Sequence, residues 1–357
     1  MKKITLSPIK DIIKDARMGK MFILVDDKNR ENEGDLVIPA SKCNSKNINF
    51  MAKHGRGLIC LSLTKRQVDK LGLPLMSSVN KARMQTAFTV SIEASKGITT
   101  GISAFDRART IKVAISLKSK KKDIVSPGHV FPLVSRNGGV LERAGHTEAS
   151  VDISKLSKLN PSAVICEVMN EDGRMARYDD LLKFSKKHKL KIASIEDLIS
   201  YRLKNEKLVT NVSTKQIKIK DFGKFDLKVF RNNLDGSEHY AITKGSFKMN
   251  KSSRVRVIST NIIKNIINYR DNNLNKSLKY LSKYNNFALI LIKDQSLVYS
   301  KTRNELPNNN ILRYYGIGAQ IIKDLKIKNM ILVSRTQKKI IGLDGYGIKI
   351  TKQEILD

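Results

Sequence analysis

Short apolar runs alternate with polar segments along the whole chain, a pattern that predicts strands mixed with amphipathic helices. Isoleucines recur at helical spacing (Ile9, Ile12, Ile13) ahead of Gly19, so a helix is predicted within residues 4–18. Further segments follow the same logic, with strands at 21–25, 36–40, 88–92, 111–117 and 164–169, and helices at 178–188 and 195–203. Strands interspersed with helices indicate a layered α/β (α+β) domain.

The composition changes after Arg202. Residues 204–215 are polar and rich in Lys, Asn and Thr, which is typical of a linker. Apolar runs then resume, predicting strands near 225–230, 255–259, 287–292 and 330–333 and a helix at 319–325. A chain of 357 residues is also long enough for two domains. We therefore expect one domain over 1–205 and a second, smaller α/β domain over 206–357.

The chain is strongly basic, with 67 Lys and Arg against 33 Asp and Glu and a net charge of +34. The excess is even, since residues 1–205 hold 38 basic and 21 acidic side chains and residues 206–357 hold 29 and 12. Neither a basic tail nor an aromatic and basic surface is present, so the pattern favours a small anionic substrate over a nucleic acid. A positive field would steer a phosphorylated substrate inward.

The sequence also predicts the compartment. No apolar run reaches the roughly 18 residues that a membrane span needs, and MKKITLSPIK lacks the apolar core of a signal peptide. The three cysteines, Cys43, Cys60 and Cys166, are scattered and odd in number, so they form no disulfide framework. A cytoplasmic protein without membrane contact is expected.

An acidic loop follows the first predicted strand. Glu31, Glu33 and Asp35 recur at a period of two beside Arg30, so an extended segment would place the three carboxylates on one face. Such a cluster needs a divalent cation, the arginine or raised pKa values to compensate its charge. The alternative interpretation is a solvated acidic turn.

Two later segments carry complementary groups. Arg143, His146 and Thr147 lie within five residues, and His129 follows a predicted turn at 127–128. Glu167 lies inside the apolar run AVICEVM and would need a partner if buried. An edge-strand glutamate facing water and a structural histidine are the alternatives. Taken together, these groups can hold a metal, anchor a phosphate and move protons beside a carbonyl.

Residues of about 5–203 resemble 3,4-dihydroxy-2-butanone 4-phosphate synthase, an enzyme family of riboflavin biosynthesis. The resemblance rests on DDKNRENEGDLVIPA, QTAFTVSIEASKGITTGISAFDRARTI, PGHVFPL, GGVLERAGHTEASVDI and AVICEVMNEDGRMAR. It implies a lyase that converts D-ribulose 5-phosphate to L-3,4-dihydroxy-2-butanone 4-phosphate and formate. It also implies a homodimer in which a partner chain helps to complete each site.

The resemblance also implies roles for individual residues. Glu31 and His146 match the ligands of Mg²⁺ (or Mn²⁺), and the general base stays open among His129, Asp35 and Glu167. The positions that match substrate-binding residues are Arg30, Glu31, Asp35, Arg143, Ala144, Gly145, His146, Thr147 and Glu167. Glu33, Cys60, Asp106 and Thr110 match further pocket positions.

Residues of about 215–357 resemble GTP cyclohydrolase II through VFRNNLDGSEHYAITKG and RYYGIGAQIIKDLKIKNMILVS. That family binds a catalytic Zn²⁺ with three cysteines, but this chain has no cysteine after Cys166 and its glycine-rich catalytic segment is missing. No Zn²⁺ is expected, and the second domain is predicted to be inactive. The alternatives are a bifunctional enzyme and a nucleotide-binding module that uses Gly316, Gly318, Gln320, Lys338 and Lys339.

Overall fold

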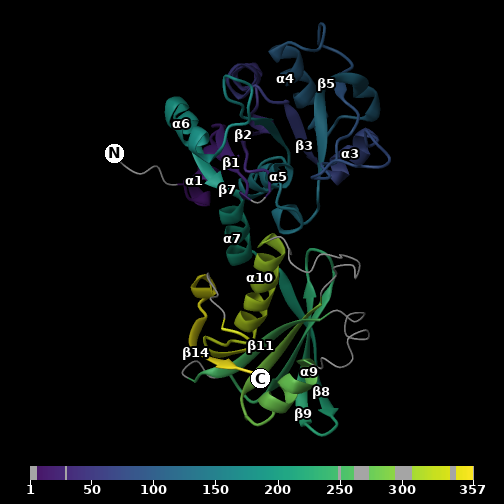
Figure 1. The fold of residues 1–357 in the computed structure, drawn as a ribbon. Helices are drawn as coiled ribbons and strands as arrows, with labels where there is room; N and C mark the ends of the chain where they lie inside the picture. The colour runs from purple at the N-terminus through teal and green to yellow at the C-terminus, as the bar shows by residue number, and fades with distance from the viewer. Residues whose placement is uncertain are drawn as a thin grey trace. The chain divides into compact units, whose positions relative to one another are not determined.

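The structure, a computed structural model, describes residues 6–28, 30–247, 251–260, 273–293, 308–337 and 343–356 (Figure 1). The chain folds into two compact units, Met1–Ile199 and Ser200–Asp357, and each has its own sheet. The predicted division at 205/206 falls just after helix α7 (Ile195–Asn205), in which the two units meet along the chain.

The first unit is built on a seven-stranded mixed sheet in the order β4-β5-β3-β6-β2-β1-β7. The strands are β1 (Phe22–Val25), β2 (Gly34–Pro39), β3 (Cys60–Thr64), β4 (Ile92–Ala94), β5 (Ile124–Ser135), β6 (Ala163–Glu167) and β7 (Lys191–Ser194). β2 pairs antiparallel with both β1 and β6, while β3 is parallel to β5 and β1 is parallel to β7. The predicted mixture of strands and helices is confirmed.

Helices cover both faces of this sheet. They are α1 (Ile9–Arg17), α2 (Ser45–Phe50), α3 (Lys65–Leu71), α4 (Ala104–Ala114), α5 (His146–Leu156) and α6 (Tyr178–His188). Ile23 and Val25 of β1 join a core cluster with α2, α3, α4 and α6, whereas the alternate residues Phe22 and Leu24 are buried outside that cluster. Because helices cover both faces of the sheet, β1 is a continuous apolar run rather than an alternation of apolar and polar residues.

One predicted strand in the first unit is wrong. Residues 111–117 alternate as a strand would, but the segment up to Ala114 belongs to α4. The Ser103 hydroxyl caps that helix by accepting from the Asp106 amide, and Ile111 and Ala114 share its core face at a spacing of three. The predicted strand at 88–92 is reduced to the start of β4 and two isolated bridges, Phe88 with Leu133 and Thr89 with Leu75.

The second unit carries another seven-stranded sheet, in the order β14-β13-β11-β12-β10-β9-β8. Its strands are β8 (Val209–Ile219), β9 (Gly223–Asn232), β10 (Glu238–Lys244), β11 (Ser253–Thr260), β12 (Phe287–Lys293), β13 (Asn329–Ser334) and β14 (Lys349–Ile355). Helices α9 (Asn273–Leu281) and α10 (Asn308–Asp324) belong to the same unit. No helix in the part of the chain that the structure describes is long and apolar enough to cross a bilayer.

Two predictions for the second unit are wrong. Residues 204–215 are not a linker: 204 and 205 end α7, 209–215 form the first part of β8, and only three residues lie between the two elements. Gly316, Gly318 and Gln320 lie inside α10 rather than in a turn, and the Gln320 side chain bonds to the backbone of Leu203, Glu206 and Leu208. Lys338 and Lys339, and the stretches 261–272 and 294–307 around the missing family motifs, lie outside the described residues.

Candidate active site

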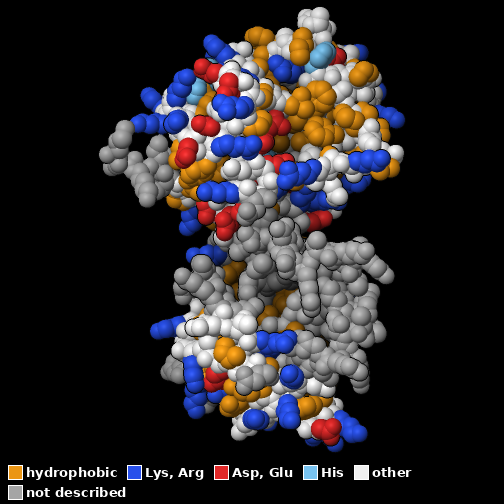
Figure 2. All heavy atoms as spheres, in the orientation of Figure 1, with side chains coloured by type: hydrophobic (Ala, Val, Ile, Leu, Met, Phe, Trp, Pro, Cys, Tyr) orange, Lys and Arg blue, Asp and Glu red, His pale blue; other side chains and the backbone are white. Residues whose placement is uncertain are grey.

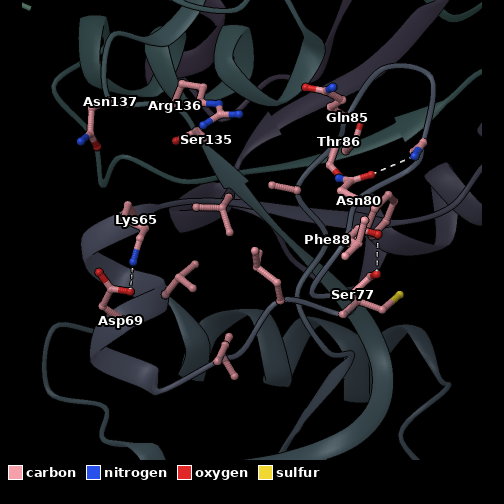
Figure 3. A pocket seen from close by; sticks show the side chains of 18 of the residues that line it. Lys65, Asp69, Ser77, Asn80, Gln85, Thr86, Phe88, Ser135, Arg136 and Asn137 are labelled. Atoms are coloured by element: carbon pink, nitrogen blue, oxygen red, sulfur yellow. Dashed lines mark hydrogen bonds and ion pairs between the residues drawn. The ribbon is translucent and has the colours of Figure 1, made fainter. Parts of the chain in front are cut away.

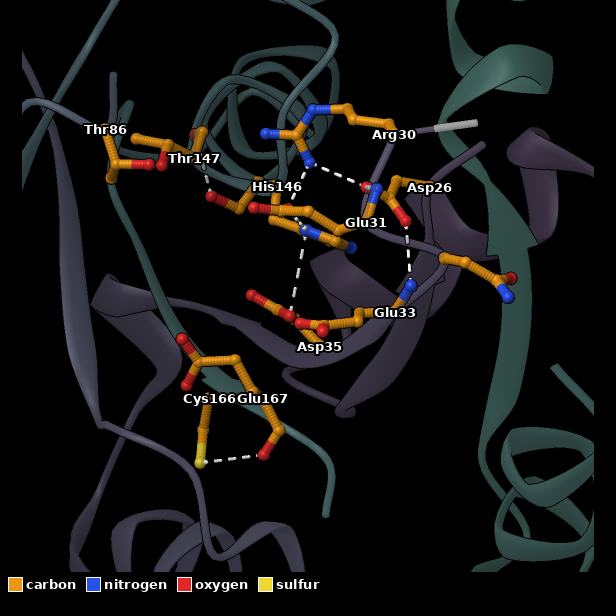
Figure 4. Close-up of polar contacts among 12 residues, drawn as sticks. Asp26, Arg30, Glu31, Glu33, Asp35, Thr86, His146, Thr147, Cys166 and Glu167 are labelled. Atoms are coloured by element: carbon orange, nitrogen blue, oxygen red, sulfur yellow. Dashed lines mark hydrogen bonds and ion pairs between the residues drawn. The ribbon is translucent and has the colours of Figure 1, made fainter. Parts of the chain in front are cut away.

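Three chain segments meet at one end of strands β2 and β6. β1 leads into the acidic loop at residues 26–33, and β2 begins at Gly34. Asp35 of β2 lies opposite Glu167 at the end of β6, and the charge of Glu167 acts on Asp35. His146, the first residue of α5, reaches the same place (Figure 4).

Asp26 organises the acidic loop. Its side chain is 1% exposed, its Oδ1 accepts from the Glu33 amide at 2.9 Å, and its Oδ2 accepts from the Glu31 amide at 3.2 Å. Oδ2 also accepts from Arg30 Nη1 at 2.7 Å, and the same guanidinium contacts the Glu31 carboxylate. The buried Asp26 carboxylate therefore fixes the backbone of the loop and the side chains of Arg30 and Glu31, both of which the sequence analysis singled out.

The predicted extended conformation of this loop is wrong. Residues 30 and 31 form a turn, and Asn32 adopts a left-handed φ of +56° that interrupts the alternation. Glu33 instead lies 3.5 Å from Arg177 Nη1, which also donates to the carbonyls of Glu31 and Asn32. Glu31 and Asp35, but not Glu33, lie within 4.0 Å of the His146 ring.

The His146 imidazole lies at the centre of the carboxylate cluster. Its Nδ1 is 4.0 Å from Glu31 Oε2 and 3.8 Å from Asp35 Oδ1. One ligand atom each from Asp26, Glu31 and His146 lie within 4.8 Å of one another. Such a group of carboxylate oxygens and one imidazole nitrogen is chemically suited to a divalent cation.

Burial and like charges shape the electrostatics of the cluster. Burial, reinforced by Glu167 and Glu31, raises the pKa of Asp35 well above its ordinary value, and burial also raises the pKa of Glu167. Burial lowers the pKa of His146, which favours the neutral ring. Asp35 Oδ1 and His146 Nε2 are both buried and lack a hydrogen-bond partner among the described residues. A bound cation would neutralise the charge on the Asp35 oxygen and accept the lone pair of the His146 ring nitrogen.

Glu167 belongs to an interior strand of the sheet, and a neighbouring backbone amide holds its carboxylate. β6 lies between β3 and β2, so the edge-strand interpretation of Glu167 is wrong. Its Oε2 accepts from the Leu58 amide at 2.9 Å. A Cβ at Gly57 would lie 2.6 Å from that oxygen, so the approach requires a glycine. Cys60 is buried nearby on β3, and its burial raises the pKa of its thiol, with Glu167 adding to the effect.

The substrate-binding positions 143–147 form the approach to α5. Arg143 Nη1 bonds to Glu148 Oε2 at 2.6 Å, and its Nη2 donates to the Met84 carbonyl and the Thr86 hydroxyl at 2.9 and 3.1 Å. Ala144 leads to Gly145, the residue before the helix, and Thr147 is buried in the first turn. A helix N-terminus beside a fixed guanidinium suits a phosphate group.

A cavity of about 1010 Å³ adjoins this approach without containing any of the predicted catalytic groups (Figure 3). It lies along α3, the loop at 73–88 and the end of β5, and its lining includes Thr86, the hydroxyl that holds Arg143. Leu75, Met76 and Val79 line it and are 54%, 52% and 64% exposed.

His129, Asp106 and Thr110 lie elsewhere in the first unit. His129 is on β5 and contacts Glu93 of β4, with 44% of its side chain exposed. Asp106 accepts from the Thr99 and Gly101 amides, and the Thr110 hydroxyl accepts from the Ala94 amide. Among the described residues, the hydrogen bond and ion pair of the His129 ring go to Glu93 and not to Glu31, Asp35 or His146.

Three carboxylates with a part in this arrangement escaped the sequence analysis, namely Asp26, Glu93 and Glu148. Asp26 is the first residue of the acidic loop, which is the one signal that could have found it. The roles of Glu93 and Glu148 depend on partners that the fold supplies.

A mixed α/β domain with a cluster of carboxylates around a buried imidazole, and an arginine just before the next helix, is the arrangement expected of an enzyme that acts on phosphorylated substrates. Residues 10–201 match the 3,4-dihydroxy-2-butanone 4-phosphate synthase family, and residues 210–354 match GTP cyclohydrolase II. The chain belongs to the 3,4-dihydroxy-2-butanone 4-phosphate synthase family, and its second domain is GTP cyclohydrolase II-like. It is thus an enzyme of riboflavin biosynthesis.

Individual relatives agree with this assignment. The riboflavin biosynthesis protein RibBA of Aquifex aeolicus is 44% identical over 372 residues, which cover 97% of this chain and 91% of that one. RibBX, a two-domain 3,4-dihydroxy-2-butanone 4-phosphate synthase from A. baumannii, is 39% identical with a TM-score of 0.84 and covers 98% and 99% of the two chains. A synthase in complex with two magnesium ions is 37% identical with a TM-score of 0.54, over 56% of this chain and 98% of that one.

Proposed function

We propose that the cluster around His146 is the site at which this chain, acting as a lyase, converts D-ribulose 5-phosphate to L-3,4-dihydroxy-2-butanone 4-phosphate and formate. The convergence of Glu31 and Asp35 on His146, within 4.0 Å, is the observation that carries the proposal. Arg143 and Thr147 would bind the phosphate, because the guanidinium is already oriented by Glu148 at the start of α5.

We propose that Glu31 and His146 hold a divalent cation, Mg²⁺ or Mn²⁺. The donor set fits, because it combines carboxylate oxygens with a neutral imidazole and leaves Asp35 Oδ1 and His146 Nε2 without a hydrogen-bond partner among the described residues. A bound cation supplies a Lewis acid for the substrate's oxygens. The two magnesium ions of a 37% identical synthase support this choice of ion.

The carboxyl groups of Asp35 and Glu167 would accept and return the protons. Removal of a proton beside the ketone needs a base, and the later loss of water and formate needs groups that return protons. Asp35 and Glu167 suit both duties, because burial raises the pKa of each toward the working pH. His129 remains the third candidate for the base.

Formate release tests the assignment. Glu31→Gln and His146→Ala should each reduce formate release from ribulose 5-phosphate by at least about 10³-fold, as expected for loss of a group that acts on the reacting atoms. Glu171→Gln, at a side chain that is 84% exposed, is the control and should keep wild-type turnover. Near-normal formate release by E31Q or H146A at saturating Mg²⁺ would contradict the proposed site.

We also propose a cytoplasmic homodimer in which His129 enters the site of the partner subunit. The exposure of His129, its separation from the His146 cluster and the exposed apolar side chains at 75, 76 and 79 support this arrangement. Figure 2 shows apolar side chains gathered on the first unit among evenly spread Lys and Arg. Mixing inactive His129→Ala and His146→Ala subunits should restore part of the activity, whereas intrachain sites would restore none.

The second domain is proposed to lack GTP cyclohydrolase activity. No cysteine follows Cys166, so the three thiolates of the family's zinc site cannot form, and no Zn²⁺ is expected. Without the zinc there is no activated water to attack a purine. Incubation with GTP and Zn²⁺ should release no formate above the substrate-free control, whereas GTP-dependent formate would establish the bifunctional alternative.

A further inference from the structure

A second carboxylate–imidazole pair lies outside the His146 cluster. Glu93 of β4 and His129 of β5 meet through Glu93 Oε1 and His129 Nδ1. The Glu93 side chain is 16% exposed and the His129 side chain is 44% exposed, so the carboxylate is enclosed while the ring reaches solvent. The strand pairing is irregular between Ile92 and Glu93, which turns this part of β4 relative to β5.

The surrounding backbone is shaped for this pair. A Cβ at Gly101 would lie 1.6 Å from Glu93 Oε1 and 2.8 Å from His129 Nδ1, and Gly101 has a φ of +88°. A Cβ at Gly128 would lie 2.2 Å from the Ile92 carbonyl carbon and 2.4 Å from Glu93 Cγ. Only glycine fits at either position, so the loop and the strand close directly over the carboxylate.

A third carboxylate holds the loop in place. Asp106 at the start of α4 accepts from the Gly101 amide and the Thr99 amide, both at 3.1 Å, and from the Thr99 hydroxyl at 2.7 Å. The loop at 97–103 is therefore anchored to a helix rather than to the ring itself. The site of Glu93 is built before any substrate binds.

The chemistry of an imidazole follows from which nitrogen carries its proton. A carboxylate at Nδ1 accepts the Nδ1–H and selects that tautomer, so the lone pair remains on Nε2. Nε2 is the ring nitrogen that Glu93 does not contact. When it takes a proton, the neighbouring carboxylate stabilises the imidazolium without itself being protonated.

We propose that Glu93 is a positioning residue that fixes the tautomer and orientation of His129, so that Nε2 accepts a proton from the substrate and returns it later. The inference rests on the proposed catalytic role of His129. The competing interpretation is a structural contact that only ties β4 to β5.

Turnover in a double-mutant cycle separates the two interpretations. Glu93→Gln keeps a hydrogen-bond acceptor but removes the charge, and it should lower kcat about 10–100-fold with KM for ribulose 5-phosphate within about twofold. In a His129→Gln background the same change should have no further effect, because Glu93 acts through the ring. Asp69→Asn, which removes a 56% exposed carboxylate from a surface ion pair, is the control.

The tautomer gives a readout that does not depend on turnover. The full chain has five histidines, so ¹⁵N-histidine spectra of wild type and H129Q assign the His129 ring. Wild-type His129 should be protonated at Nδ1, and Glu93→Ala should shift it toward the Nε2-protonated form. An unchanged tautomer in E93A would overturn the inference.

The kinetic outcomes are equally decisive. An E93Q enzyme with wild-type kcat, or an equal loss from E93Q with and without His129, would overturn the positioning role. Full activity of H129Q would refute the catalytic role of His129, and this inference with it, while leaving the His146 site intact. No formate from the wild-type enzyme would instead refute the proposed function as a whole.

Discussion

Asp35, the second residue of β2, lies opposite Glu167, the last residue of β6, in the antiparallel register of neighbouring strands. Sheet pairing thus places the buried Asp35 carboxyl group beside the partly buried one of Glu167, with His146 Nδ1 3.8 Å from Asp35 Oδ1. Like charges directly opposite destabilise a sheet. The proposed catalytic chemistry therefore depends on an arrangement of carboxyl groups that opposes folding.

Removal of the Asp35 charge should stabilise the metal-free protein. Because the pKa of Asp35 is raised in the folded state, its ionisation disfavours folding, and stability is lost as the pH rises above the unfolded value of about 3.9. Asp35→Asn should raise the Tm in EDTA at pH 7–8, by about 2–4 °C for each kcal/mol gained. The gain should shrink as the pH falls toward 4.

Calorimetry between pH 4 and 8 measures this effect, and the variant should release no formate. A D35N protein that is less stable than wild type at pH 8, or a Tm difference that does not change with pH, would show that the Asp35 charge carries no folding penalty.

Asp26 should be needed for metal affinity, although it was not predicted from the sequence. Asp26→Asn replaces one acceptor of the loop with a donor and weakens the bond to Arg30, so Glu31 loses its orientation. We expect the Mg²⁺ concentration for half-maximal formate release to rise about 10–100-fold. Asp27→Asn is the control, because it removes the same charge from the same loop while keeping the Asp26 bonds. A comparable loss of Mg²⁺ affinity in that variant would show that net charge, rather than the Asp26 bonds, causes the effect.

Gly57 should be intolerant of a side chain. An alanine Cβ there would lie 2.5 Å from the Glu167 carbonyl oxygen and 2.6 Å from Oε2, so β6 or the carboxylate must move. We expect Gly57→Ala to cost about 1–3 kcal/mol of stability, measured by urea unfolding, and to lower kcat.

The matched control is Gly318→Ala in α10, where the nearest atom would lie at an ordinary 3.5 Å. That change should be neutral or stabilising, because alanine favours a helix interior. Equal stability of G57A and wild type would mean that the contact with Glu167 is not a constraint.

The thiols beside the site should be unreactive. Burial raises the pKa of Cys60 and of Cys166 far above its ordinary value, and raises that of Cys43 to about 12. At pH 7.5 iodoacetamide should therefore label none of the three in the native protein and leave formate release unchanged. Mass spectrometry should find all three labelled after unfolding in urea, and rapid native labelling of Cys60 would contradict this account.

Elements with strong local signals could be predicted from the sequence. The helix over 178–188 and the buried strands around 21–25 and 164–169 follow from periodicity and continuous apolar runs. Residues 111–117 were misassigned because their alternating Ile and Val fit the pattern of a strand. The N-cap at Ser103 and the packing of Ile111 in the core stabilise a helix instead. The edge strand β8 looked like a linker because it pairs on one side alone, with β9.

The candidate site follows the same pattern: residues in compact motifs could be predicted from the sequence, whereas pairs of residues far apart in the sequence could not. Compact motifs pointed to Glu31 and His146, and the structure brings them together. Glu93 was missed because its partner comes from the fold, since His129 lies 36 residues away. In the second unit, the contacts of the Gln320 amide likewise span more than 110 residues. Asn32 in the left-handed region likewise broke a periodicity that assumed an extended chain.

Electron spin-echo spectroscopy of the Mn²⁺-loaded protein with ¹⁵N-labelled histidine tests the central claim most directly. If Glu31 and His146 hold the ion, the wild-type spectrum should show coupling to one histidine nitrogen. That coupling should vanish in His146→Ala and persist in His129→Gln. Coupling that survives the loss of His146, or no histidine coupling in the wild type, would contradict the account.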